Sequence, residues 1–160
     1  MYPSTIAFLS SVLASLASAE CVPLETLKAP YCPPKPVSRE QQRLILEEFV
    51  HKTYIERNVT KGLLDHMAED YIQHSPSVLS GRDEALQALS WITPGTVNFT
   101  VRHLSMDGDL AWVYSRIDVI GQTEPTAGVD ILRFNGSCIQ EHWDVQQTRP
   151  ANRTNTLDMW

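Results

Sequence analysis

The chain has 160 residues, with 13 Lys and Arg against 19 Asp and Glu, which gives a formal net charge of -6 at pH 7. An acidic chain has no electrostatic attraction for nucleic acid or for an anionic membrane surface, so we expect neither as a partner. The length suffices for one domain with a real hydrophobic core and is too short for two ordinary domains.

Residues 1–19 have the pattern of a secretory signal peptide. Residues 6–17 are apolar or small and carry no charge, and Ala17-Ser18-Ala19 before Glu20 is a small-residue cleavage site. No later stretch approaches about 18 uninterrupted apolar residues, so no transmembrane span is expected. We therefore predict a secreted protein.

Four Asn-x-Ser/Thr sequons agree with this prediction, because such sites are glycosylated only in chains that enter the secretory pathway. The candidate glycosylation sites are Asn58, Asn98, Asn135 and Asn152.

Cys21, Cys32 and Cys138 are an odd number of cysteines for a compartment that permits disulfides. A Cys21–Cys32 bond would close a Pro-rich loop, whereas either residue bonded to Cys138 would fix the N-terminal segment against a later hairpin. The sequence leaves these pairings open. No Cys-x-x-Cys spacing occurs, so neither a zinc ribbon nor a dithiol redox site is expected.

The segment 20–37 is rich in proline, which excludes a helix or a central strand and predicts an extended arm. The domain itself is expected to span residues 38–160. Ser38 and Gln41 have capping-box spacing at the start of an amphipathic helix that reaches about Arg57. Its inner face is predicted to carry Leu44, Ile45, Phe49, Val50, Tyr54 and Ile55.

Two shorter helices are predicted next, over residues 60–67 and 83–92. Residues 68–76 follow the first of them and lead through a loop to Gly81-Arg82. The inward side chains are expected to be Leu63, Leu64 and Met67 in the first of these helices and Ala85, Leu86, Leu89 and Ile92 in the second.

The rest of the chain has the pattern of strands. Residues 97–101 alternate apolar with polar side chains, Asp107-Gly108 marks a turn, and residues 110–120 form a second strand. Residues 129–145 then form a hairpin around Asn135-Gly136. Helices first and an antiparallel sheet afterwards predict an α+β fold with the helices gathered on one face of the sheet.

Several strings in this order resemble the SnoaL-like family of the nuclear transport factor 2-like superfamily, and the resemblance runs from about Ser38 to the C-terminus. It implies a cone-shaped fold, in which three helices close a strongly curved antiparallel sheet over an apolar pocket. The matching strings are Tyr71-Ile72-Gln73-His74-Ser75-Pro76, Gly81-Arg82, Asp107-Gly108-Asp109, Val129-Asp130-Ile131-Leu132-Arg133-Phe134, Glu141-His142-Trp143-Asp144-Val145-Gln146 and Ala151-Asn152-Arg153-Thr154-Asn155.

The resemblance to the cyclases of this family implies that Asp130 is an acid/base residue. Where those enzymes have a histidine on the preceding strand, this chain has Arg116, which can stabilise an enolate but cannot exchange protons at neutral pH. His74, at a pocket position of the family, and His142 are the candidate donors or second acid/base. The substrate-binding candidates are Tyr71, Trp112, Tyr114, Asp118, Trp143 and Asp144.

The hairpin register decides which side chains accompany Asp130. A two-residue turn at Asn135-Gly136 would place Asp130 on one face with Glu141 and Trp143. A longer loop with a bulge would place it beside His142 and Asp144 instead. Relatives carry glycine where this chain has Ser137, which favours the second register.

The resemblance implies cofactor-independent acid/base chemistry on a small apolar carbonyl metabolite, such as cyclisation, isomerisation or dehydration of a polyketide-like compound. One alternative is an epoxide hydrolase-like site made of Arg116, Asp118 and Asp144. Another is a non-catalytic secreted module that binds a ligand or dimerises. No cofactor or metal is expected, and a homodimer through the sheet is common in the fold.

Overall fold

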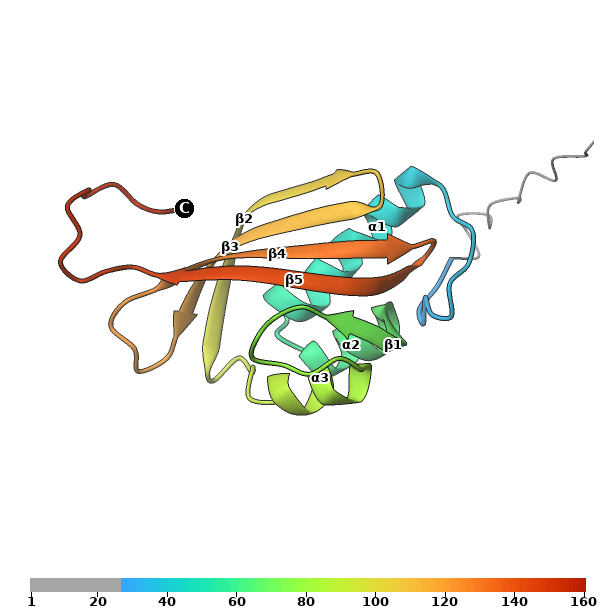
Figure 1. Ribbon diagram of the computed structural model, residues 1–160, viewed down its shortest axis with the longest axis horizontal. Helices are drawn as coiled ribbons and strands as arrows, with labels where there is room; N and C mark the ends of the chain where they lie inside the picture. The colour runs from blue at the N-terminus through green and yellow to red at the C-terminus, as the bar shows by residue number, and fades with distance from the viewer. Residues whose placement is uncertain (1–26) are drawn as a thin grey trace, which may run out of the picture.

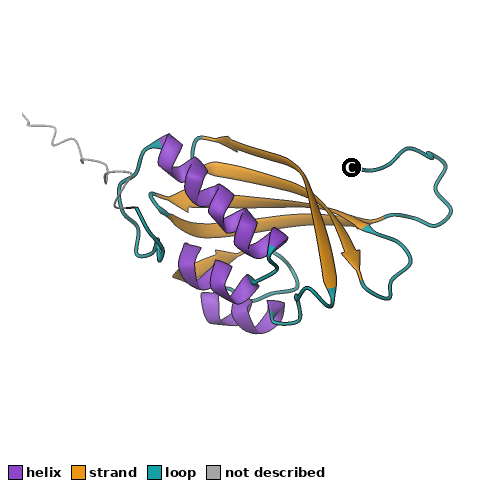
Figure 2. Cartoon of the chain, turned by 180° about the vertical axis from the view of Figure 1, so that it is seen from behind, coloured by secondary structure: helices purple, strands orange, loops and turns teal. Residues whose placement is uncertain are grey.

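The structure is a computed structural model that describes residues 27–160, so the predicted leader and Cys21 lie outside the described residues. The α+β prediction is confirmed: helices lie against one face of a curved five-stranded sheet (Figures 1 and 2). The elements in chain order are α1 (Arg39–Val50), the π-helix η2 (His51–Ile55), α2 (Val59–His66), β1 (Met67–Gln73), α3 (Arg82–Leu89), β2 (Val97–Asp107), β3 (Leu110–Val119), β4 (Thr126–Asn135) and β5 (Cys138–Thr148).

Helix α1 begins with the predicted capping box, in which the Ser38 side chain accepts from the Gln41 backbone and the Gln41 side chain accepts from the Ser38 backbone. The helix continues directly into η2, whose wider turn rotates the following residues. Tyr54 is buried as predicted, whereas Ile55, also predicted on the inner face, is 50% exposed. Leu44 was also predicted to face inward and is exposed.

The two shorter helices α2 and α3 are close to their predicted positions. Leu63 and Met67 are buried as expected, but Leu64 is exposed because it lies on the solvent side of α2. Ala85 of α3 is fully buried, and the three other apolar residues predicted to face inward pack against the core from partly buried positions.

The sheet has the strand order β1-β5-β4-β3-β2, in which β1 runs parallel to β5 and every other neighbouring pair is antiparallel. Strand β1 falls mostly in residues 68–76, for which the sequence predicted no helix or strand. Its sequence MAEDYIQ places two charges side by side and lacks strict alternation. Pairing with β5, distant in sequence, is what makes the segment a strand, so local pattern could not reveal it.

The β4–β5 hairpin combines both registers considered from the sequence. At its turn Asn135 faces Cys138, but Gln140 is an extra residue in β5, and beyond it Arg133 faces Glu141. This bulge shifts the register, so that Asp130 faces Asp144. The expectation that Asp130 shares a face with His142 and Asp144 is therefore confirmed, by a tight turn followed by a bulge rather than by a longer loop.

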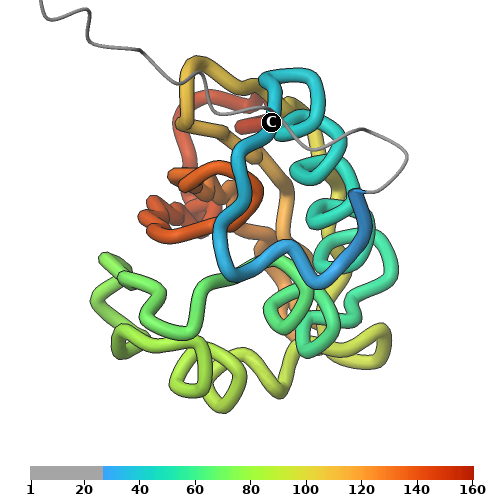
Figure 3. The backbone as a smooth tube through the Cα atoms, turned by 90° about the vertical axis from the view of Figure 1, so that its right-hand side faces the viewer, coloured from blue at the N-terminus to red at the C-terminus, as the bar shows by residue number. Residues whose placement is uncertain are grey.

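The N-terminal arm crosses the end of the sheet beside this turn (Figure 3). Cys32 forms a disulfide with Cys138, one of the three pairings that the sequence left open. The Ser137 hydroxyl donates to the backbone oxygen of Tyr31 at 2.5 Å and accepts from the backbone N–H of Lys35 at 3.0 Å. The arm is thus bound to the hairpin through covalent and polar contacts.

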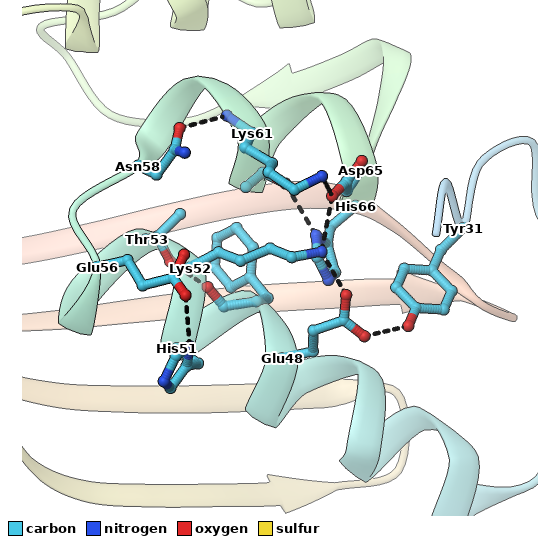
Figure 4. Close-up of polar contacts among 12 residues, drawn as sticks. Tyr31, Glu48, His51, Lys52, Thr53, Glu56, Asn58, Lys61, Asp65 and His66 are labelled. Atoms are coloured by element: carbon cyan, nitrogen blue, oxygen red, sulfur yellow. Dashed lines mark hydrogen bonds and ion pairs between the residues drawn. The ribbon is translucent and has the colours of Figure 1, made fainter. Parts of the chain in front are cut away.

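A charged cluster joins the arm to the helices (Figure 4). The Tyr31 hydroxyl donates to Glu48, and the Lys52 ammonium bridges Glu48 and Asp65. His66 lies beside them, fully buried, with Nδ1 2.9 Å from the backbone oxygen of Gly62. A carbonyl oxygen can only accept, so Nδ1 carries the proton, and Nε2 has no partner among residues 27–160. Burial lowers the pKa of His66 to about 4.

Within the described part of the chain, no helix is long and apolar enough to cross a membrane.

Candidate functional site

A cavity of about 130 Å³ lies between the helices and the inner face of the sheet. Most of its wall is apolar. The apolar wall includes Phe49, Val59, Leu63, Met67, Val78, Leu89, Ile92, Phe99, Ile117 and Leu132.

One side of the cavity is polar and is centred on Asp130. The Asp130 Oδ1 atom lies 2.9 Å from His142 Nε2, and Oδ2 accepts a 2.7 Å hydrogen bond from the Tyr54 hydroxyl. Only 17% of the Asp130 side chain and 13% of the His142 side chain are exposed. A carboxylate so little exposed requires hydrogen-bond donors, and two neighbouring elements supply them.

The sheet register brings Asp130 and His142 together. Asp130 faces Asp144 and Leu132 faces His142, so Asp130 and His142 are diagonal neighbours on the inner face of β4 and β5. The bulge in β5 is necessary for this arrangement, because without it His142 would point to the outer face.

The second ring nitrogen of His142 is also bonded. Its Nδ1 lies 2.8 Å from the side-chain oxygen of Gln73, the last residue of β1. Tyr54 and Gln73 were both absent from the site predicted from the sequence. Tyr54 has the helical spacing of a core residue and so did not indicate a site. Gln73 lies within a string that resembles the family, but nothing about the residue itself indicated a role.

Two tyrosines at the polar side remain neutral hydroxyl donors. Burial raises the pKa of Tyr54 well above its usual range, and the Asp130 carboxylate adds to the effect. Burial likewise raises the pKa of Tyr71, helped by Asp130 and Asp144. Tyr71 was a predicted substrate-binding residue and lines the cavity, as Asp144 does. Its hydroxyl has no hydrogen-bond partner among the described residues, so it can donate to a ligand.

Four predicted site residues on β3 lie on the other side of the sheet. Val113 faces Asp130 across the β3–β4 pair, so odd-numbered residues from 111 to 117 point towards the helices and even-numbered ones away. The prediction that Arg116 assists Asp130 is therefore wrong, because Arg116 points away from the face that carries Asp130. The residues corrected to the outer face are Trp112, Tyr114, Arg116 and Asp118.

The outer-face residues have partners of their own. Arg116 forms a two-pronged ion pair with Asp118, and its guanidinium lies 4.6 Å from the ring centre of Trp160. The Tyr114 hydroxyl donates to the backbone oxygen of Met159. These contacts hold the C-terminal tail against the outer face. The epoxide hydrolase-like arrangement is not formed, because Asp144 points to the inner face.

His74 and Trp143 are corrected in the same way. Their rings stack with centres 4.5 Å apart, and His74 Nε2 lies 3.6 Å from a Glu141 oxygen. Glu141 also pairs with Arg133. Odd-numbered residues of this part of β5 point away from the helices, so His74 lies with them and does not share the cavity with Asp130.

All four sequon asparagines are exposed in the structure. Asn58 caps α2 by accepting from the backbone N–H of Lys61, and Asn135 lies at the hairpin turn. Their glycosylation stays a prediction. Among residues 27–160, no three His, Cys, Asp or Glu side chains are grouped so as to hold a metal ion.

Comparison with known proteins gives one family match. A family model described as the SnoaL-like domain matches residues 46–142. No curated protein matches the chain.

Solved structures with the same fold include three of bacterial origin. AclR, a candidate hydroxylase from Streptomyces galilaeus, is 18% identical with a TM-score of 0.57 over 71% of this chain and 83% of its own. A candidate ketosteroid isomerase from Kribbella flavida is 22% identical with a TM-score of 0.57 over 74% of this chain and 89% of its own. IdmH, a candidate polyketide cyclase from Streptomyces antibioticus, is 16% identical with a TM-score of 0.51 over 66% of this chain and 91% of its own.

Proposed function

We propose a function for this chain from the premise that it belongs to the SnoaL-like domain family, to which its residues 46–142 match. The proposed function is cofactor-independent acid/base catalysis on a small apolar carbonyl compound, of the isomerase or cyclase kind. The relatives in fold include a candidate ketosteroid isomerase and a candidate polyketide cyclase, and both reaction types begin with removal of a proton beside a carbonyl group.

One observation carries the proposal, namely that Asp130 is hydrogen-bonded to His142 and Tyr54 at the polar side of an otherwise apolar cavity. A carboxylate held in such a place is a candidate general base with a fixed direction of approach. The apolar wall favours an uncharged substrate and excludes bulk water from the reacting end.

The proposed first step is removal of the proton on the carbon beside the carbonyl group by an Asp130 oxygen. The electron pair of the broken C–H bond forms the enolate double bond, and negative charge moves to the substrate oxygen. The Tyr71 hydroxyl donates a hydrogen bond to that oxygen. In isomerisation Asp130 returns the proton to another carbon; in cyclisation the enolate carbon attacks a second carbonyl carbon, whose oxygen then takes the proton.

The cavity volume limits the part of the substrate that reacts inside it. A cavity of about 150 Å³ in another protein holds benzene, and this one measures about 130 Å³. It therefore accommodates about one ring or a short ketone chain, and any larger part of a substrate must extend outside.

The minimal step can be tested without the natural substrate. Small cyclic ketones are incubated with the protein in D₂O, and exchange of their α-protons is followed by NMR. We expect exchange in the wild type and a loss of about 100-fold or more in Asp130→Asn, because a general base contributes about 10²–10⁴-fold. Asp109→Asn serves as a matched control, since Asp109 is an exposed turn residue paired with Arg39. Equal rates in wild type and Asp130→Asn would remove Asp130 as the base.

The same geometry also favours one alternative function. Both oxygens of Asp130 already receive hydrogen bonds, as in a structural carboxylate of a binding protein. A non-catalytic module would bind small apolar ketones in the cavity and leave their α-protons unexchanged. Binding measured by ligand-detected NMR, with no exchange between pH 5 and about pH 9, would support that alternative.

We also propose that the chain is secreted. The Cys32–Cys138 disulfide supports this proposal, because such bonds persist in oxidising compartments and are rare in reducing ones. Expression of the full chain in a eukaryotic secretory host tests it, by detection of the protein in the medium and by its mass before and after enzymatic removal of N-glycans.

A further inference from the structure

We infer that Gln73 is a positioning residue that holds a proton on Nδ1 of His142 and so keeps one shared proton between His142 and Asp130. The inference deepens the proposed acid/base function, on which its catalytic meaning rests. Its structural content, the position of the imidazole protons, can be tested separately.

The orientation of the Gln73 amide follows from a second hydrogen bond. The Gln73 side-chain oxygen lies 3.1 Å from the backbone nitrogen of Ser75, which donates to it. A backbone N–H can only donate, so the amide must present its oxygen at this position and not its NH₂ group. The usual ambiguity between the two ends of a glutamine amide is thereby removed.

The protonation of His142 then follows from the same oxygen. His142 Nδ1 lies 2.8 Å from the Gln73 oxygen, which can only accept, so Nδ1 carries a proton. The opposite nitrogen, Nε2, lies 2.9 Å from Asp130 Oδ1. If no proton lay between these two atoms, two lone pairs would face each other across this distance. The favoured states are an imidazolium with a carboxylate and a neutral imidazole with a carboxylic acid, and both hold one shared proton.

The backbone fixes Gln73 in this position. Gln73 is paired with His142 in the parallel β1–β5 ladder, and the next backbone N–H, that of His74, donates to the His142 carbonyl oxygen at 2.9 Å. The Gln73 backbone N–H donates to the Ser80 hydroxyl at 3.0 Å. These backbone hydrogen bonds fix the position of the Gln73 amide beside the imidazole. A residue that orients another side chain must itself be held in place in this way.

Among the residues that line the polar side of the cavity, the shared proton is what neutralises the charge of Asp130. Tyr54 from η2 and Tyr71 from β1 are neutral, and Asp144 from β5 is the other acidic residue that lines the polar side. With its shared proton the His142–Asp130 pair has no net charge, which suits an uncharged substrate. In the imidazolium–carboxylate state Asp130 is ionised and can accept the proton that the substrate loses.

The test uses NMR of the complete chain labelled with ¹⁵N in histidine, without any ligand. We expect Nδ1 of His142 to carry a proton in the wild type. In Gln73→Leu the acceptor for Nδ1 is absent, so the ring is expected to adopt the form protonated at Nε2 alone, which can donate to Asp130. Gln73→Glu keeps an acceptor and is expected to preserve the Nδ1 proton.

Gln140→Leu is the matched control. Gln140 also makes a side-chain hydrogen bond across the β1–β5 pair, to Asp70 at 3.1 Å, but does not touch His142. It should behave as the wild type does. The inference is overturned if Gln73→Leu keeps the Nδ1 proton as the wild type does, or if Gln140→Leu loses it equally. Because no turnover is measured, failure here is distinct from failure of the α-proton exchange.

Discussion

His142 Nε2 lies 2.9 Å from Asp130 Oδ1, and both side chains are largely buried on the inner face of the sheet. The two residues belong to neighbouring antiparallel strands and contact each other diagonally. A hydrogen bond between such groups couples their contributions to stability, because loss of one partner leaves the other buried without it.

We predict this coupling in a double-mutant cycle of Asp130→Asn and His142→Gln. Free energies of unfolding from denaturant titration at pH 7 should give an interaction energy of about 0.5–3 kcal/mol, as for residues in direct contact. The single variants should each be destabilised, since each leaves a buried polar partner with one bond fewer.

A second cycle provides the control and uses His74, which the resemblance placed at a pocket position. His74 stacks on Trp143 at the outer face. Asp130→Asn and His74→Gln should therefore be additive within about 0.5 kcal/mol. An interaction energy in this second cycle as large as in the first would contradict the placement of the two histidines.

The contrast between these histidines shows what the sequence could predict. The helix order, the α+β class and the hairpin followed from apolar spacing, capping and turn residues, which act locally. The sequence singled out Asp130 and His142 as candidates, and the structure places these two residues in contact. Arg116 and His74 were misplaced because a strand shows two faces with the same local pattern, and the face depends on pairing with other strands.

The elements that complete the site depend on contacts between distant parts of the chain. Strand β1, with Gln73 at its end, exists through its pairing with β5. Tyr54 of η2 was predicted on the inner face of its helix, but its hydrogen bond to Asp130 joins residues that are far apart in sequence. The homodimer through the sheet stays a prediction.

Our second prediction concerns the buried histidine of the helical cluster. Burial lowers the pKa of His66 from its ordinary 6.5 to about 4 in the folded chain. The unfolded chain therefore binds a proton first as the pH falls, and folding stability is lost between pH 6.5 and about 4. The full loss from this residue is about 3 kcal/mol, since one pKa unit corresponds to about 1.4 kcal/mol.

Denaturant titration at several pH values measures this effect. Glu48 and Asp65, whose pKa values are lowered by Lys52 despite burial, also lose stabilisation on acidification. A variant must therefore isolate the histidine. His66→Asn keeps a donor for the Gly62 oxygen and should flatten the pH dependence. His51→Asn is the matched control, because it removes a histidine of the same helical region whose side chain is 62% exposed. Equal slopes in wild type and His66→Asn would contradict the prediction.

The third prediction concerns the disulfide between the arm and the hairpin. Cys32 and Cys138 are 106 residues apart in sequence, so their bond restricts the unfolded chain over a long loop. Replacing both by serine should lower the free energy of unfolding by about 2–5 kcal/mol. Peptide mapping without reduction should link Cys32 to Cys138. A peptide that links Cys21 to Cys32 would contradict the assignment.

The fourth prediction separates backbone conformation from crowding at the hairpin turn. Gly136 has φ 56°, and a Cβ there would lie 2.3 Å from the backbone oxygen of Lys35 in the arm. Gly121 also has a positive φ, 91°, but nothing lies within 4 Å of its Cβ position. Gly121→Ala should therefore cost only the conformational penalty of about 1–2 kcal/mol. Gly136→Ala should cost about 2–5 kcal/mol, because the arm must also move away. Equal losses in denaturant titration would show that the arm does not pack on this turn.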